Sequence, residues 1–149
     1  MNLKQTCISL ISALTIVACH HTPQTTDADV FAWYADEMNL CIPEAPHRFI
    51  IVPAASCGGC RAAVALYASH SDSSTTVIVS GKLASMYANT TSLIDTACLC
   101  DRLNWSQANI VEIFTSLGKA DSIVSNDAAQ TILKFAPDAQ RLCTDNTCQ

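Results

Sequence analysis

A Cys-Gly-Gly-Cys motif that closely follows a short apolar run constrains the fold of this chain more than any other feature. The run is Arg48–Val52 (RFIIV), closed by Pro53, and the motif occupies residues 57–60. A continuous run of β-branched and other apolar residues is typical of a strand buried on both faces, as in a parallel sheet covered by helices. The following stretch, Arg61–Ser69, favours a helix. The segment is therefore predicted to run from a buried strand through the motif into a helix.

This context gives the two cysteines of the motif different environments. Cys57 is expected at the helix N-terminus, where unpaired backbone N–H groups and the helix dipole stabilise a thiolate. Cys60 lies one turn further along and is expected to face inward, placed to attack a mixed disulfide formed by Cys57. The pattern favours thiol–disulfide exchange. A purely structural disulfide between the same two residues is the alternative.

The rest of the chain alternates predicted helices and strands. A helix is predicted from Asp27 to the residues before Pro43, with Tyr34 and Cys41 on its apolar face. The further predicted elements are a strand over Thr75–Val79, a short helix over Lys82–Ala88, a strand over Ser92–Thr96, a hairpin of Asn109–Thr115 and Asp121–Ser125, and a helix over Asp127–Ala136. This order predicts an α/β sandwich, a mixed sheet with flanking helices.

The N-terminus has the pattern of an export signal. Lys4 gives a short positive start, and Cys7–Ala18 is apolar over the length of a signal peptide. The run ends Ile-Val-Ala-Cys at residues 16–19, which resembles the bacterial lipobox. The resemblance implies a signal peptide over residues 1–18, cleavage before Cys19, and a lipid on that cysteine. A plain signal peptide and a retained membrane anchor are the alternatives.

A lipid on Cys19 implies a location in the cell envelope, with the protein held by its acyl chains at the periplasmic face of a bacterial membrane. Residues 19–26 are polar and aperiodic and are predicted to be a tether between the lipid and the domain. The domain itself is predicted over residues 27–136, followed by a cysteine-containing tail over residues 137–149.

The cysteine content is high for a chain of 149 residues, with nine cysteines in all. Such a content indicates an oxidising compartment, a metal site or thiol chemistry. Beyond Cys7 and Cys19, seven cysteines remain, so in an oxidising compartment at least one is free, bound to a metal or paired with another molecule. Besides the motif, the candidates for disulfides are Cys41, Cys98, Cys100, Cys143 and Cys148.

The favoured pairing among these candidates is a structural bridge from Cys41 to Cys98 or Cys100. Cys98 and Cys100 could instead bridge each other or relay electrons from the Cys57–Cys60 pair. Together with that pair they could also supply four thiolates to zinc or copper(I). Cys143 and Cys148 are expected to close a small loop in the tail.

The carboxylates, the net charge and the absence of other motifs limit the chemistry and the partners that the sequence supports. Asp95 and Asp101 lie near the Cys98-Leu99-Cys100 segment and could assist proton transfer, although carboxylates in loops are usually solvated. The formal charge of −5 argues against a nucleic-acid partner, which requires a basic surface. No Ser/His/Asp arrangement, phosphate-binding loop or HExxH motif occurs, so hydrolase and nucleotide chemistry have no support.

The strand and motif together resemble the thioredoxin-like family. Residues 49–53 (FIIVP) and 56–63 (SCGGCRAA) are similar to that family's strand and WCGPCR-type motif, and the order of elements fits over residues 27–136. The chain looks most like the small thioredoxin-like lipoproteins of Gram-negative bacteria. Ser56 stands where the family usually has Trp, and Gly59 where it often has Pro. Residues 106–109, where the family places a cis-proline facing the motif, contain no proline.

The resemblance implies a thioredoxin-like sandwich in which Cys57 is the attacking thiol and Cys60 the resolving thiol. It implies no organic cofactor and no resident metal, and partners that are protein thiols and disulfides of the cell envelope. The second hypothesis is a binding or accessory lipoprotein on the same scaffold, whose disulfides are only structural.

Overall fold

The computed structural model describes residues 26–103 and 109–137. Its elements are α1 (Asp27–Glu37), β1 (His47–Val52), α2 (Gly58–Ala68), β2 (Thr75–Ser80), η1 (Gly81–Leu83), β3 (Leu93–Asp95), η2 (Leu99–Arg102), β4 (Ile110–Ser116), β5 (Lys119–Asn126) and α3 (Ala128–Phe135). The predicted signal peptide, Cys19, Cys143 and Cys148 lie outside the described residues.

The five strands form one mixed sheet in the order β3-β2-β1-β4-β5. The pairs β1–β2 and β2–β3 are parallel, whereas β1–β4 and β4–β5 are antiparallel. The carboxyl ends of the three parallel strands therefore lie together at one end of the sheet, where the loop to α2 and the segment after β3 meet. The α/β class and the mixed sheet predicted from the sequence are confirmed.

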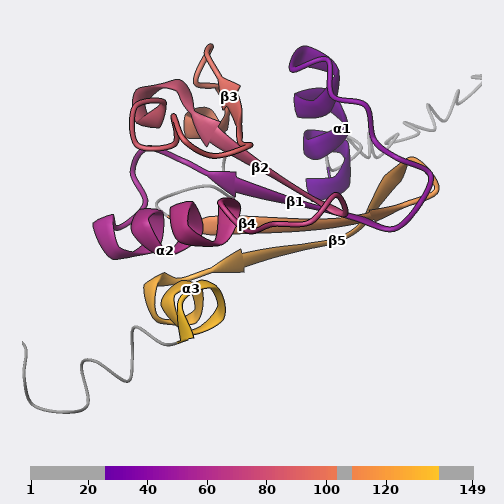
Figure 1. The fold of residues 1–149 in the computed structure, drawn as a ribbon. Coiled ribbons are helices and arrows are strands. Elements are labelled where there is room, and N and C mark those ends of the chain that lie inside the picture. The colour runs from indigo at the N-terminus through magenta and orange to yellow at the C-terminus, as the bar shows by residue number, and fades with distance from the viewer. Residues whose placement is uncertain (1–25, 104–108, 138–149) are drawn as a thin grey trace, which may run out of the picture.

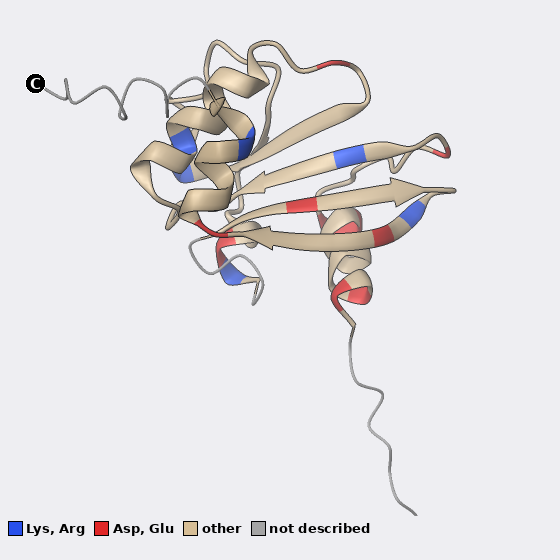
Figure 2. Ribbon diagram, turned by 90° about the horizontal axis from the view of Figure 1, so that it is seen from below, with Lys and Arg blue, Asp and Glu red and all other residues tan. Residues whose placement is uncertain are grey.

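Helices cover both faces of the sheet (Figure 1). On one face, Ile50 and Val52 of β1 pack with α2 and α3, including Val64 and Phe135. On the other face, Phe49 and Ile51 belong to a cluster with residues of α1. Alternate residues of β1 thus enter two separate apolar clusters, which explains why its sequence is continuously apolar. Charged residues are sparse within the sheet (Figure 2).

Helix α1 ends earlier than predicted, so Cys41 is not on its apolar face. The helix closes in a Schellman arrangement in which Leu40 N–H donates to Ala35 C=O at 2.8 Å and Asn39 N–H donates to Asp36 C=O at 3.0 Å. Asn39 takes the left-handed conformation with φ 51° that such an ending requires. Asparagine adopts this conformation at low cost, and the helix therefore stops before Pro43 is reached.

The helix predicted over Lys82–Ala88 is not formed. Only η1 is helical, and its continuation consists of turns with i→i+3 hydrogen bonds, such as Met86 N–H to Leu83 C=O and Tyr87 N–H to Ala84 C=O. Among the described residues, no helix is both long enough and apolar enough to cross a membrane.

The β4–β5 turn provides a first testable prediction. Its two central residues, Leu117 and Gly118, have φ of 50° and 74°, as a type I′ hairpin turn requires. Leucine is strained there, and at 72% exposure it contributes little burial. We expect Leu117→Asn to raise the free energy of unfolding by about 0.5–1 kcal/mol, because asparagine tolerates this conformation. Urea unfolding measures the change, and Leu117→Val, which is β-branched, should shift it in the opposite direction.

Candidate functional site

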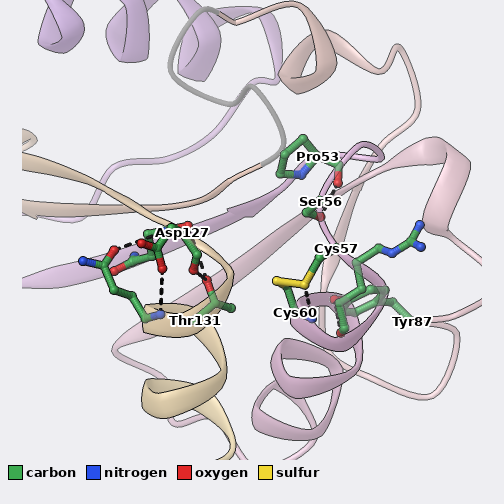
Figure 3. The surroundings of a disulfide bond; sticks show 10 residues. Pro53, Ser56, Cys57, Cys60, Tyr87, Asp127 and Thr131 are labelled. Carbon is green, nitrogen blue, oxygen red and sulfur yellow. Dashed lines mark hydrogen bonds between the residues drawn. A yellow bond between two sulfur atoms is a disulfide. The ribbon is translucent and has the colours of Figure 1, made fainter.

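The structure places Cys57 and Cys60 in a disulfide at the start of α2, with an S–S distance of 2.03 Å and Cα atoms 5.1 Å apart (Figure 3). Cys57 is the N-cap of the helix, and its Sγ accepts a hydrogen bond from Cys60 N–H at 2.9 Å. The predicted position of the motif, after a buried strand and at a helix N-terminus, is therefore confirmed. This position directs backbone N–H groups toward the sulfur of Cys57.

The two sulfur-bearing residues differ in exposure. Cys60 is 2% exposed and belongs to the apolar cluster under α2 and α3, whereas Cys57 is half-buried. Only Cys57 is therefore open to a partner thiol. A Cβ on Gly59 would lie 3.4 Å from Ile132 Cδ1, so α3 borders the motif on one side.

The loop between β1 and the motif is held by its own residues and by α2. Ser56 is buried, and its hydroxyl donates to Pro53 C=O at 2.6 Å (Figure 3). Arg61 Nη1 donates to Ala54 C=O at 3.3 Å, and the Tyr87 hydroxyl donates to Arg61 C=O at 2.8 Å. Burial raises the pKa of Tyr87, which keeps this hydroxyl protonated as a donor. Ser56 thus stabilises the turn between β1 and the motif.

Asp101 of η2 also holds the loop between β1 and the motif. Its Oδ1 accepts Ala54 N–H at 2.8 Å, and its Oδ2 accepts the Ser80 hydroxyl and the Lys82 ammonium, both at 3.0 Å. Burial by itself would raise the pKa of Asp101, but the hydrogen bonds from Ala54, Lys82 and Ser80 outweigh burial and lower it. The expectation that this loop carboxylate is merely solvated is wrong, because three donors from two segments of the chain, Ala54 on one and Ser80 and Lys82 on the other, meet at it.

Removal of the Asp101 carboxylate should loosen this edge of the sheet. We expect Asp101→Ala to lower the free energy of unfolding by about 2 kcal/mol, because the buried Ser80 hydroxyl and Ala54 N–H lose a charged acceptor. Since the pKa of Asp101 is lowered in the folded state, its contribution is present above the unfolded pKa near 4 and is lost as pH falls through the folded pKa. Urea unfolding at pH 7 and at pH 3 should show the difference between wild type and variant shrinking at pH 3. An unchanged difference would contradict the carboxylate's role.

A second buried carboxylate lies beside the Cys98-Leu99-Cys100 segment. Asp95 is 0% exposed, and its Oδ2 accepts Cys100 N–H at 2.7 Å and the Tyr34 hydroxyl at 3.3 Å. Asp95 Oδ1 has no hydrogen-bond partner among the described residues. Burial, then interaction with Asp95, raises the pKa of the Cys100 thiol. Asp95 is therefore also not a solvated loop carboxylate.

The predicted bridge from Cys41 to Cys98 or Cys100 is not formed. Cys41 and Cys98 are free thiols. Cys41 lies near the β4–β5 turn, because Glu44 C=O accepts Leu117 N–H at 2.9 Å, whereas Cys98 follows the opposite, carboxyl end of β3. A strand of six residues spans about 20 Å, and a disulfide needs Cα atoms within about 7 Å. The two ends of the sheet are too far apart.

The four-thiolate metal site has no support in the geometry. Within residues 26–103 and 109–137, no three His, Cys, Asp or Glu side chains are grouped so that they could hold a metal ion. Cys57 and Cys60 are bonded to each other instead.

A hollow of about 520 Å³ that no sequence pattern predicted lies at the amino ends of β1 and β2, away from the disulfide. His47, Arg48 and Asp72 are among its lining residues. The His47 ring shares a hydrogen bond of 2.9 Å with the Thr76 hydroxyl, and burial lowers the pKa of His47 despite the opposing effect of Asp72. These side chains are engaged with the protein itself.

Comparisons of the chain with protein-family models, with curated proteins and with solved structures found no match. Function has to be inferred from the residues themselves.

Proposed function

We propose that this chain is a thiol–disulfide exchange protein of the cell envelope, acting through Cys57 and Cys60 on a thioredoxin-like fold. The observation that carries the proposal is the Cys57–Cys60 disulfide at the N-terminus of α2, with Cys57 as the N-cap and the more exposed partner. A structural disulfide needs no such placement, whereas an exchange site needs one sulfur in reach of a partner and a stabilised thiolate.

The reaction follows from the different positions of the two sulfurs. A substrate thiolate attacks Cys57 Sγ, forms a mixed disulfide and expels Cys60 as the leaving thiolate. A second substrate thiolate then attacks the substrate sulfur of the mixed disulfide and releases Cys57. The substrate dithiol is oxidised by two electrons and the Cys57–Cys60 pair is reduced. The reverse reaction begins with Cys57 as the nucleophile and ends with attack by Cys60.

The arrangement of the sheet supports the thioredoxin-like part of the proposal. Strand β1 leads into the motif and α2, β2 pairs with it in parallel, and the β4–β5 hairpin pairs antiparallel on its other side before α3. This is the order that the resemblance of residues 49–63 implies. The family's proline position falls at residues 106–109, of which only Asn109 lies within the described part of the chain.

The cellular part of the proposal depends on the N-terminal signal. A lipid on Cys19 would tether the domain through residues 19–26 to a membrane outside the cytoplasm, where disulfides persist. The partners proposed are thiols and disulfides of other envelope proteins.

A redox titration tests the activity. The purified protein is equilibrated in glutathione and dithiothreitol buffers, alkylated and digested with trypsin, which releases Cys57 and Cys60 together on residues 49–61. We expect a reduction potential above about −300 mV, which marks an exchangeable pair. A reduction potential below this value would mark a structural bridge and would favour the hypothesis of a binding or accessory lipoprotein. Thiols that become reactive only after a chelator removes zinc or copper would favour a metal site.

A further inference from the structure

We propose that Cys98 and Cys100 form a second thiol–disulfide site, which closes to a disulfide by exchange with a low-molecular-weight disulfide. The site is separate from Cys57 and Cys60, and the proposal does not depend on the activity proposed for them. It is based on the backbone of the Cys98-Leu99-Cys100 segment, on the unequal exposure of its two thiols and on a buried carboxylate beside the second thiol.

The backbone conformation favours a short distance between the Cα atoms of Cys98 and Cys100. Cys98 has the left-handed conformation, with φ 54° and ψ 36°, and the chain enters the 3₁₀ helix η2 at the next residue. Leu99, the residue between the two cysteines, lies in this helix, so the Cα atoms on either side of it are closer together than in an extended strand, where Cα atoms two residues apart lie about 7 Å from each other. A disulfide needs Cα atoms within about 4.4–6.8 Å. The left-handed conformation is also strained for a cysteine, and such strain is frequent at functional sites.

The two thiols have unequal access to solvent. Cys98 is half-buried, and its Sγ lies 4.0 Å from Thr96 C=O. Cys100 is 0% exposed, and its Sγ lies 3.9 Å from Asp101 Oδ1. An external disulfide can therefore meet Cys98 first, and Cys100 is reached only from within the protein.

Two charged side chains, Lys82 and Asp95, lie near the two cysteines. The Lys82 ammonium bonds Asp101 at 3.0 Å. Asp101 raises the pKa of Lys82, and Cys98 and Cys100 contribute to the same shift. On the inner side, Asp95 holds Cys100 N–H through Oδ2, while its buried Oδ1 has no hydrogen-bond partner among the described residues. This carboxylate is placed to take the Cys100 proton.

The reaction proceeds in two balanced steps. The Cys98 thiolate attacks one sulfur of the external disulfide, forms a mixed disulfide with it and expels the other sulfur as a thiolate, which takes up a proton from water. Cys100 then attacks Cys98 Sγ, its proton passes to Asp95 and on to the second departing thiolate, and the Cys98–Cys100 bond closes. Two thiols of the protein are oxidised, and the external disulfide is reduced to two thiols.

Glutathione disulfide serves as the probe in the test. The folded, reduced protein is incubated with it, remaining thiols are alkylated, and the tryptic peptide of residues 83–102 is analysed by mass spectrometry. This peptide contains Cys98 and Cys100 and no other cysteine, and residues 49–61 report on Cys57 and Cys60 in the same digest. We expect the peptide of residues 83–102 to lose two hydrogens and escape alkylation, whatever the state of the other peptide.

Three variants test the order of events. Cys100→Ser should accumulate glutathione on Cys98, and Cys98→Ser should leave Cys100 unmodified because it is buried. Asp95→Asn should slow closure of the mixed disulfide by on the order of 100-fold while leaving its formation unchanged. Peptides that keep two alkylated thiols, carry two glutathiones, or join Cys98 to Cys41 would overturn the proposal. The cysteine variants keep the test decisive if Asp95→Asn fails to fold.

Discussion

In a Cys98→Ser background, which removes the second proposed site, exchange with a substrate disulfide is expected to stop when Cys57 is replaced by serine. A hydroxyl cannot form the mixed disulfide, and Cys60 at 2% exposure cannot take over the attack. Reduction of an accessible protein disulfide by the pre-reduced variant, followed by thiol release, measures the loss. Retained activity would show that another thiol carries the chemistry.

Cys60→Ser should give the complementary result. Attack by Cys57 still occurs, but the resolving thiol is missing, so the mixed disulfide with the partner accumulates and can be isolated. Cys41→Ser is the matched control, because Cys41 is exposed and free and lies near the opposite end of the sheet. The control should exchange like the wild type. Equal trapping by Cys41→Ser would indicate non-specific oxidation of exposed thiols.

The second large effect concerns Glu112, a carboxylate buried in the middle of β4. It is 0% exposed and faces α2 and α3, opposite Ile50 in the sheet register. Its Oε1 accepts the Lys134 ammonium at 2.6 Å and the Asn126 amide at 2.8 Å, and its Oε2 pairs with Arg48 at 3.4 Å. These contacts join β1, β4, β5 and α3, the helix that borders the disulfide.

Replacing Glu112 with alanine should lower the free energy of unfolding by about 3 kcal/mol, because buried donors and two cations lose their shared carboxylate. The side chains of Arg48 and Lys134 are 23% and 42% exposed, so both cations can partly turn to water, which keeps the loss at the lower end of the range for a buried pair. We expect the melting temperature to fall by roughly 10 °C.

Thermal and urea unfolding of Glu112→Ala measure this loss, with Glu37→Gln as the control. Glu37 is an exposed glutamate at the end of α1, so its substitution should change the free energy of unfolding by less than about 0.5 kcal/mol. Equal effects of the two substitutions would show that the cluster around Glu112 contributes no more than a surface charge.

The elements that sequence reasoning placed well are those specified by neighbouring residues. The apolar run of β1, the cap of α3 at Asp127 and the β4–β5 hairpin are each encoded within a few positions, through burial, capping and turn chemistry. The early end of α1 and the missing helix over Lys82–Ala88 also have local causes. Asn39 adopts a left-handed conformation that stops α1, and the residues after η1 form successive turns in place of a helix.

The candidate site likewise has one part that nearby residues specify and another part that depends on long-range contacts. The position of Cys57 at the start of α2 follows from a segment of about twenty residues, so the sequence alone predicts it. The surroundings of that segment depend on long-range contacts: Asp101 reaches Ala54 across 47 positions, and Asp95 meets Tyr34 across 61. In the strand pattern, Glu112 is one polar residue among apolar neighbours, and nothing local indicates that Lys134 and Arg48 will enclose it.

The sequence by itself determined the strand, the motif, the helix and the class of the fold, because hydrophobic pattern and helix capping act between near neighbours. The tertiary structure alone decided which carboxylates are buried, which thiols face solvent and which cysteines are too far apart to pair. These properties depend on the order of strands in the sheet. Parallel pairing brings the carboxyl ends of β1, β2 and β3 together, whereas Cys41 lies near the opposite end of the sheet, beside the β4–β5 turn.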